Sequence, residues 1–154
     1  MTDFKPHVMI VEARFYEPLA DELVRGAVRV LEAAGATHER FAVPGAFEIP
    51  AAIACAVAAK SSPAGRSFDG YVALGCVIRG ETTHYDYVCQ ESARGLQDLA
   101  INHQIAVGYG ILTVENEEQA WERAKLDRGD KGGDAVRACL AMIDLKRRFK
   151  LARA

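Results

Sequence analysis

The hydrophobic positions of the chain change their spacing several times, and each change marks the border of an expected element. Residues 8–11 form a short apolar run, and apolar positions then recur every three or four residues over residues 19–34. The first pattern predicts a strand, and the second predicts one buried face of a helix. Gly35 ends this helix, and residues 38–43 form a second expected strand before a Pro-Gly turn signal.

The middle of the chain places two expected helices around a strand that is apolar on both faces. Residues 46–60 are rich in Ala, Ile and Val, which predicts a buried helix whose first turn, around Pro50, is irregular. We expect residues 61–67 to form an exposed loop. Residues 71–78 are nearly all apolar, as in a central parallel strand, and residues 84–103 carry apolar positions at helical spacing.

The last third of the chain predicts one more strand and two helices. Residues 105–114 are expected as the strand, and Asn116 with Gln119 three residues later is typical of a helix start. A glycine-rich segment interrupts that short helix, and a final helix is expected from about Ala135. It ends in the basic run KRRFK, which suits a helix carboxyl terminus, with nucleic-acid binding as the alternative.

Strands that alternate with helices predict right-handed βαβ crossovers and a parallel sheet. We therefore expect an α/β fold, namely a three-layer flavodoxin-like domain with a four-stranded parallel sheet flanked by helices. A chain of 154 residues is near the commonest domain size, so one domain spanning residues 1–154 is expected.

Composition narrows the classes of function. The chain is 50% hydrophobic and 26% charged, as in ordinary globular proteins, and its net charge of -2 disfavours nucleic acid as the main partner. It has no signal-peptide pattern and no apolar run of membrane-spanning length, so a cytoplasmic location is expected. The four cysteines lack CxxC spacing and are expected to be reduced, buried thiols.

Ligands of such folds bind beyond the carboxyl ends of the strands, so the turns there are the candidate sites. After the third expected strand, Gly80 would let a ligand approach the backbone, and the following helix start can hold an anion. The alternative is a simple helix cap by Thr82 or Thr83. His84 lies at the same positive helix end, where a neutral imidazole can relay a proton, although it could also be an ordinary surface histidine.

The other turns offer aromatic and charged groups. Phe47 could stack on a planar ring while Glu48 accepts hydrogen bonds from ligand hydroxyls, or Phe47 could pack into the core with Glu48 in solvent. Residues 14–16 (Arg-Phe-Tyr) add aromatic surface after the first strand, and Glu115 and Asn116 follow the fourth.

Arg123 and Lys131 are candidate phosphate ligands near the glycine-rich segment, although an isolated arginine is usually only a surface charge. The chain has no GxGxxG after a strand, no GxxxxGK[ST], no GxSxG and no metal-ligand cluster. Chemistry without a cofactor, a metal or a covalent nucleophile is therefore expected, unless a lysine such as Lys131 forms an imine.

Four segments together resemble the signatures of the lumazine synthase family, also called the riboflavin synthase beta chain. In chain order they are PGAFEIP, LGCVIRGETTHYDYV, GILTVENEEQAWERA and KGGDAV. The resemblance implies condensation of 5-amino-6-(D-ribitylamino)uracil with 3,4-dihydroxy-2-butanone 4-phosphate to give 6,7-dimethyl-8-ribityllumazine, without any cofactor. Imine formation, phosphate loss, ring closure and dehydration would follow in some order.

The resemblance also implies roles for individual residues. Phe15 would stack on the pyrimidine, His84 would transfer protons, and Arg123 of a neighbouring subunit would bind the phosphate, with Lys131 as a secondary contact. Tyr109 occupies a position where Phe is frequent, so its hydroxyl needs a partner. The ring and the ribityl chain would be held by residues Ala46, Phe47, Glu48, Cys76, Val77 and Ile78, and the phosphate by the backbone of Glu81 and Thr82.

Members of this family assemble as homopentamers with active sites between subunits, and some form decamers or sixty-subunit icosahedral shells. The expected loop at residues 61–67 is longer than in many shell-forming relatives, which favours a free pentamer. Two rival functions remain. A flavodoxin-like electron carrier would need a hydroxyl- and glycine-rich loop after the first strand, and a non-catalytic flavin- or lumazine-binding relative could have lost His84 or Arg123.

Overall fold

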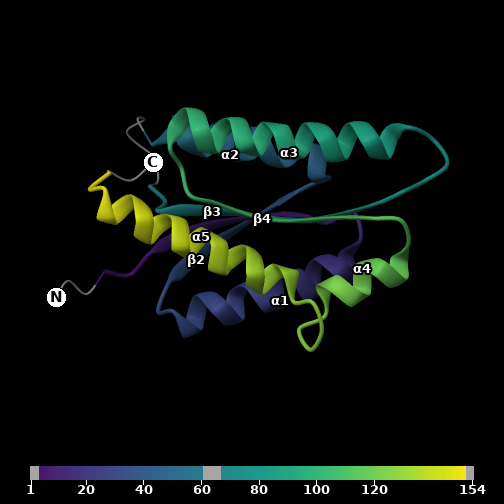
Figure 1. Cartoon of the computed structure of the whole chain (residues 1–154), viewed down its shortest axis with the longest axis horizontal. Coiled ribbons are helices and arrows are strands. Elements are labelled where there is room, and N and C mark those ends of the chain that lie inside the picture. The colour runs from purple at the N-terminus through teal and green to yellow at the C-terminus, as the bar shows by residue number, and fades with distance from the viewer. Residues whose placement is uncertain (1–3, 61–66, 152–154) are drawn as a thin grey trace.

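Four parallel strands form the middle layer of the molecule, which we describe from a computed structural model covering residues 4–60 and 67–151 (Figure 1). The strand order is β2-β1-β3-β4, so the apolar strand β3 is central, as predicted. This order is that of flavodoxin-like folds and confirms the expected class. The strands are β1 His7–Ala13, β2 Thr37–Val43, β3 Gly70–Ile78 and β4 Val107–Val114.

Helices cover both faces of the sheet and complete the three layers seen in Figure 1. On one face lie α2 (Ile49–Ala59), which a short 3₁₀ turn at Ala46–Glu48 precedes, and α3 (His84–His103). The other face carries α1 (Glu17–Ala33), α4 (Glu117–Ala124) and α5 (Lys131–Arg148). The turns that follow the strands lie at the end of the sheet opposite the two chain termini.

Alternation along β1 explains why the sheet has a core on each side. Val8 and Ile10 belong to the cluster under α1 and α5, whereas Met9 and Val11 belong to the cluster under α2 and α3. All four are buried, as expected of a parallel strand that helices cover on both faces. The sheet is therefore a rigid platform for the turns at its carboxyl end.

Local sequence signals placed several elements well. The helix predicted at residues 84–103 has those bounds in α3. Asn116 caps α4, because its Oδ1 accepts a hydrogen bond from the Gln119 backbone N–H at 2.9 Å, and Gln119 Oε1 accepts from the N–H of Glu115 at 2.8 Å. The loop predicted at residues 61–67 lies, except for its last residue, outside the described residues. Within the described ranges, no helix is both long and apolar enough to cross a membrane.

Helix α2 is less buried than its composition predicted. Only Ile49 and Ile53 are buried, while its other apolar side chains are exposed or half-exposed in the single chain. A helix that is apolar all round carries no sequence signal for which face meets the sheet. The prediction of buried thiols is accordingly wrong for Cys55, which is exposed on α2, and only in part right for Cys89, which is half-buried; all four cysteines are free, as expected.

The last helix starts four residues earlier than predicted, at Lys131 instead of Ala135. Glycines weaken a helix prediction, and Gly132 and Gly133 occupy the first turn. Asp130 offsets this by capping the helix, since its Oδ1 accepts a hydrogen bond from the Gly133 N–H at 3.3 Å. Lys131 therefore lies on a helix and not in the expected glycine-rich loop.

Candidate active site

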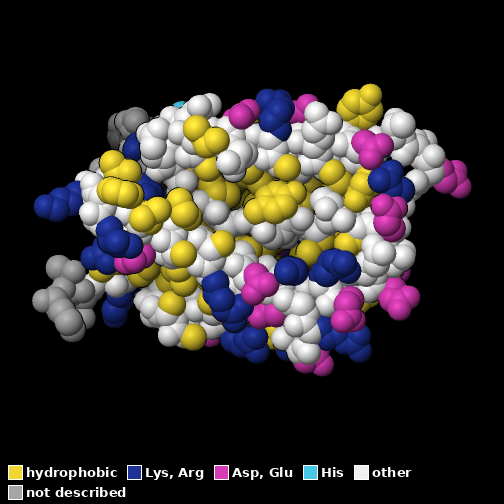
Figure 2. Space-filling view, viewed as in Figure 1, with side chains coloured by type: hydrophobic (Ala, Val, Ile, Leu, Met, Phe, Trp, Pro, Cys, Tyr) yellow, Lys and Arg dark blue, Asp and Glu magenta, His cyan; other side chains and the backbone are white. Residues whose placement is uncertain are grey.

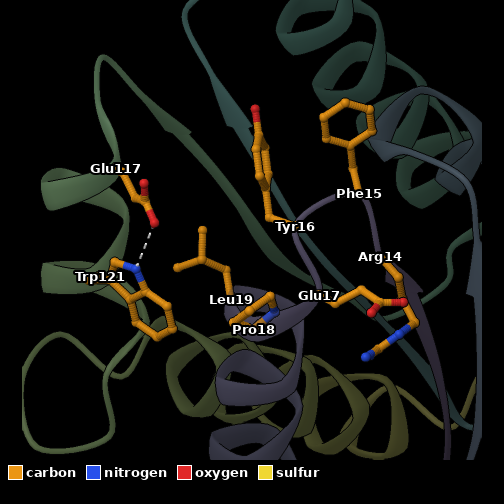
Figure 3. Close-up of a pocket in the computed structure, with 8 residues that line it drawn as sticks. All are labelled: Arg14, Phe15, Tyr16, Glu17, Pro18, Leu19, Glu117 and Trp121. Atoms are coloured by element: carbon orange, nitrogen blue, oxygen red, sulfur yellow. Dashed lines mark hydrogen bonds between the residues drawn. The ribbon is translucent and has the colours of Figure 1, made fainter.

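The turn after β1 presents two aromatic rings at the carboxyl end of the sheet. Phe15 is 73% exposed, and its ring meets Tyr16 edge to face with centroids 4.9 Å apart. Arg14 points away from both rings in Figure 3, and its guanidinium bonds Glu12 at 2.8 Å and Asp21 at 2.5 Å. The ion pairs hold the turn while leaving the Phe15 ring open to a ligand.

The turn after β2 contains the 3₁₀ segment, which turns one side chain into the core and the next two outward. Ala46 is buried against the core, whereas Phe47 is 58% exposed and Glu48 is exposed. The alternative in which Phe47 packs into the core is therefore wrong. An exposed aromatic beside a carboxylate can both stack on a planar ring and accept hydrogen bonds from hydroxyls.

The end of β3 supplies the apolar floor between these two turns. Burial raises the pKa of the Cys76 thiol to about 12, helped by the nearby Cys89, so Cys76 stays protonated and acts as a small apolar group. Val77 and Ile78 follow on the same strand and are half-buried. No covalent role follows from this thiol.

The start of α3 leaves room for an anion. The cap residue Thr83 makes no side-chain capping bond, and Thr82 Oγ1 accepts only a long hydrogen bond, 3.4 Å, from the His84 N–H. Gly80 has open space where a Cβ would lie, and its φ is outside the left-handed region, so the backbone does not require glycine there. Arg79 lies beside this helix start, with its guanidinium 4.3 Å from the centroid of the Tyr85 ring and its Nε donating to Glu115 Oε2 at 2.7 Å.

The turns after β1 and β2, the end of β3 and the start of α3 line a hollow of about 460 Å³, which we call the central hollow. It brings together eight of the residues that the sequence predicted for the site, from the turns after β1 and β2, the end of β3 and the first turn of α3. They are Phe15, Ala46, Phe47, Glu48, Cys76, Val77, Ile78 and His84. Most of the lining is apolar, with the carboxylate and the imidazole as its titratable groups apart from Tyr16 and Cys76.

The other predicted residues do not line the central hollow of the same chain. Glu81 and Thr82 are exposed on the turn that leads to His84. Arg123 lies near the end of α4, where its Nη1 donates to the Gln119 carbonyl oxygen at 3.0 Å. Lys131 is at the start of α5, where its Nζ lies 3.5 Å from Asp134 Oδ2.

Tyr109 lies on the edge strand β4 and is 45% exposed. Burial raises the pKa of its phenol, and a hydrogen bond with the Ser92 side chain on α3 opposes that rise. Ser92 is thus the partner that the sequence alone did not provide for this hydroxyl. Hydrophobic side chains gather along the middle of the face seen in Figure 2, where β4 runs in Figure 1.

A second hollow, of about 540 Å³, adjoins the first and was not predicted. It shares Phe15 and Tyr16 with the central hollow, and Figure 3 shows Trp121 and Glu117 of α4 on its far side. Trp121 Nε1 donates to Glu117 Oε1 at 3.4 Å. The spacing of four residues between these two on a predicted helix was the available signal for their contact.

The described titratable side chains do not converge on a metal position. Among residues 4–60 and 67–151, no three His, Cys, Asp or Glu side chains are grouped so that they could hold a metal ion. The central hollow instead combines an exposed ring, a carboxylate, an imidazole and an open helix start. Such a set suits a planar, hydroxyl-bearing ligand next to an anionic one.

Comparisons with known proteins agree with this arrangement. The family model described as 6,7-dimethyl-8-ribityllumazine synthase matches residues 5–147. The protein of that name from Bartonella tribocorum is 59% identical over 94% of this chain and 93% of its own length. 6,7-Dimethyl-8-ribityllumazine synthase 1 from Rhizobium meliloti is 58% identical over 97% of each chain, and the Agrobacterium fabrum protein is 56% identical over 94% of this chain and 97% of its own. With its nearly full-length match, this chain belongs to the 6,7-dimethyl-8-ribityllumazine synthase family.

Proposed function

We propose that the chain condenses 5-amino-6-(D-ribitylamino)uracil with 3,4-dihydroxy-2-butanone 4-phosphate in a site that two copies of the chain share. The product is 6,7-dimethyl-8-ribityllumazine, with release of phosphate and water, as a step of riboflavin biosynthesis. Membership of the family over residues 5–147 supports the reaction. The observation that carries the shared site is the central hollow, which gathers the ring-binding residues but not Arg123.

The ring-binding half of the site is the central hollow. Phe15 stacks on the pyrimidine, and residues 46–48 hold the ring and the ribityl chain. Cys76, Val77 and Ile78 form the apolar floor against which the ring lies. The exposure of Phe15 and Phe47 supports these roles, because both rings have uncovered faces in the free chain.

The phosphate-binding half combines the helix start of one copy with cations of the next. The backbone of Glu81 and Thr82 meets the phosphate near the positive end of α3, which lacks a side-chain cap from Thr83. Arg123 of the adjacent copy binds the same phosphate through its guanidinium fork, and its Lys131 and Tyr109 complete the wall. All three of these side chains are exposed or partly exposed and so can meet another subunit.

Catalysis rests mainly on holding two reactive substrates in register. A positioned amine and carbonyl react far faster than the same groups free in solution. His84, which lines the hollow beside the uncapped helix start, transfers protons during dehydration and phosphate loss. The chemistry requires no cofactor, because imine formation, elimination and ring closure are all proton and group transfers.

Homopentamers are the assembly we propose, with decamers or sixty-subunit shells as larger alternatives. Two surfaces support self-association, since exposed apolar patches mark contact sites: the exposed apolar side of α2 and the apolar surface over β4, of which Figure 2 shows the second. Cys55→Glu places a charge on α2 and should lower the sedimentation coefficient to that of a smaller species. Cys55→Ser is the matched control and should sediment as the unmodified protein does.

The free thiols suit a reducing compartment, and we place the enzyme in the cytosol.

The experiment that tests this function mixes the purified protein with the two substrates and follows the absorbance and fluorescence of the lumazine. We expect product to form faster than in the protein-free blank. A rate equal to the blank, together with tight lumazine binding, would favour a non-catalytic binding protein. Reversible reduction of a bound flavin without condensation would favour an electron carrier.

A further inference from the structure

The connection between α4 and α5, residues 125–130, folds back on the end of α4 and lies beside α1 in Figure 1. Its backbone is tied to α4, because the Gly129 N–H donates to the Glu122 carbonyl oxygen at 3.0 Å. It is also tied to α1, because Glu22 Oε1 accepts from the Leu126 N–H at 3.2 Å. We call residues 125–130 the α4–α5 corner; it separates Arg123 from Lys131.

Asp130 is a buried charge at the end of this corner. The residue is 7% exposed and adopts a left-handed backbone, with φ 45°. One carboxylate oxygen caps α5, while Oδ2 pairs with Arg29 of α1 at 3.1 Å and lies 3.9 Å from Arg137. A carboxylate removed from water needs such partners, so Asp130 ties the corner to one place on α1.

Two glycines make this close contact with α1 possible. A Cβ at Gly26 would collide with Asp130 Oδ1, and a Cβ at Gly132 would collide with the Leu23 carbonyl oxygen. The absence of a side chain at Gly26 thus lets the Asp130 carboxylate approach α1, and its absence at Gly132 lets the backbone of α5 approach the Leu23 carbonyl oxygen of α1. The Gly132 contact is with a backbone carbonyl, which cannot relax by a change of rotamer, so it fixes the start of α5, and with it the adjoining end of the corner, against α1.

Gly129 couples the position of the corner to that of Arg123. A Cβ at Gly129 would lie 2.8 Å from Arg123 Cα and 2.9 Å from its carbonyl oxygen, closer than real side-chain carbons approach. The corner thus packs on the backbone of the residue that is proposed to bind phosphate. A shift of the corner must move Arg123, and it must also move Lys131, which follows Asp130 directly.

We infer that Asp130 is a positioning residue that, through its ion pair with Arg29 and the Gly129 contact, aims Arg123 at the phosphate of the adjacent subunit's site. The inference rests on the proposed role of Arg123 and adds the residues that give this side chain its direction. Gly129 has no side chain, and Asp130 is buried with its carboxylate oxygens paired to the Gly133 N–H and to Arg29, so their effect on phosphate binding is indirect.

The test compares the KM values for the two substrates in assembled protein carrying Asp130→Asn, Arg29→Gln or Gly129→Ala. Asparagine keeps a capping oxygen and tolerates the left-handed backbone, so Asp130→Asn removes the charge with little strain. Arg29→Gln removes the partner charge and leaves Asp130 in place. Gly129→Ala pushes directly on Arg123 and keeps both charges of the ion pair.

Each variant should raise the KM for the phosphate substrate by about tenfold, because small misplacements of binding groups have large effects. The KM for the pyrimidine substrate should change little. In an Arg123→Ala background, adding Asp130→Asn should cause no further rise, since residues that act through one another are not additive. Glu32→Gln, an exposed charge change on α1, is the control for Asp130→Asn. Gly35→Ala, strained at φ 70° near the other end of α1, is the control for Gly129→Ala.

The outcomes separate this inference from the proposed function. If Arg123→Ala raises the phosphate-substrate KM but the three variants do not, the positioning role is wrong and the proposed function stands. If Arg123→Ala itself has no effect, the proposed phosphate role of Arg123 fails, and the inference fails with it. Equal changes in both KM values, or losses that the two controls share, would assign Asp130 to stability alone.

Discussion

Truncation of Phe15 to alanine is the sharpest perturbation of the ring-binding half of the site. In the free chain the ring touches Tyr16 edge to face and is otherwise open, with 73% of the residue exposed. Removing it should therefore cost little free energy of unfolding. The truncation should instead weaken binding of the pyrimidine substrate, whose ring would cover a face of Phe15.

The magnitude follows from the exposed area. A phenylalanine can bury about 200 Å², so roughly 150 Å² remains open at Phe15, and a stacked ring covers about half of that. At about 25 cal/mol per Å², the lost contact amounts to roughly 2 kcal/mol, or about a thirtyfold rise in KM for the pyrimidine substrate.

The assay is the initial rate of lumazine formation with the pyrimidine varied at saturating phosphate substrate. Phe149→Ala is the matched control, because Phe149 is 70% exposed at the end of α5 and does not line the central hollow. That control should leave both KM values unchanged. An unchanged pyrimidine KM in Phe15→Ala, with the fold intact by circular dichroism, would refute the stacking role.

Three further predictions concern charge. Arg123→Ala should raise the KM for the phosphate substrate by roughly 10- to 150-fold, from about 1.5–3 kcal/mol for a charged hydrogen bond, and kinetics with that substrate varied will check it. His84→Ala should lower kcat by less than the roughly 10²–10⁴ typical of acid–base residues, because the substrates react unaided; abolished turnover in a folded variant would rule this out. Burial would raise the pKa of Glu12, but the bonds from Arg40 and Arg14 outweigh it and hold the pKa below its ordinary value of 4.5. The ionised Glu12 therefore stabilises the fold above pH 4.5, so Glu12→Gln should lower the free energy of unfolding by about 1–3 kcal/mol at pH 7, and denaturant titrations should show that difference shrinking as the pH falls below 4.5.

The fold was predictable because its signals are local. The apolar run of β3 and the helical spacing of α3 each report burial against a sheet directly, and the Asn116 cap is a short-range hydrogen bond. Helix α2 was mispredicted as buried because its residues are apolar on every side. The start of α5 was missed because Gly132 and Gly133 disfavour a helix by propensity. Close packing requires them, since a Cβ at Gly132 would collide with the Leu23 carbonyl oxygen of α1 and one at Gly133 with the Asp130 carboxylate.

The candidate site was predictable only at the level of its turns. A parallel sheet collects the turns after its strands at one end, which was sufficient to bring Phe15, Phe47 and His84 to one hollow. Contacts between distant segments left no local signal. Ser92 as the partner of Tyr109 and the ion pair of Asp130 with Arg29 both depend on how helices meet strands and connections in space.

The central claim is that the hollow of one copy and Arg123 of another form one site. It is tested most directly by refolding equal amounts of Phe15→Ala and Arg123→Ala together and measuring lumazine formation at low substrate concentrations. In mixed rings, about a quarter of the sites would combine an intact hollow with an intact Arg123, so activity should rise well above the average of the two variants refolded separately. A mixture that only matches that average, in assemblies that contain both variants, would contradict the shared site.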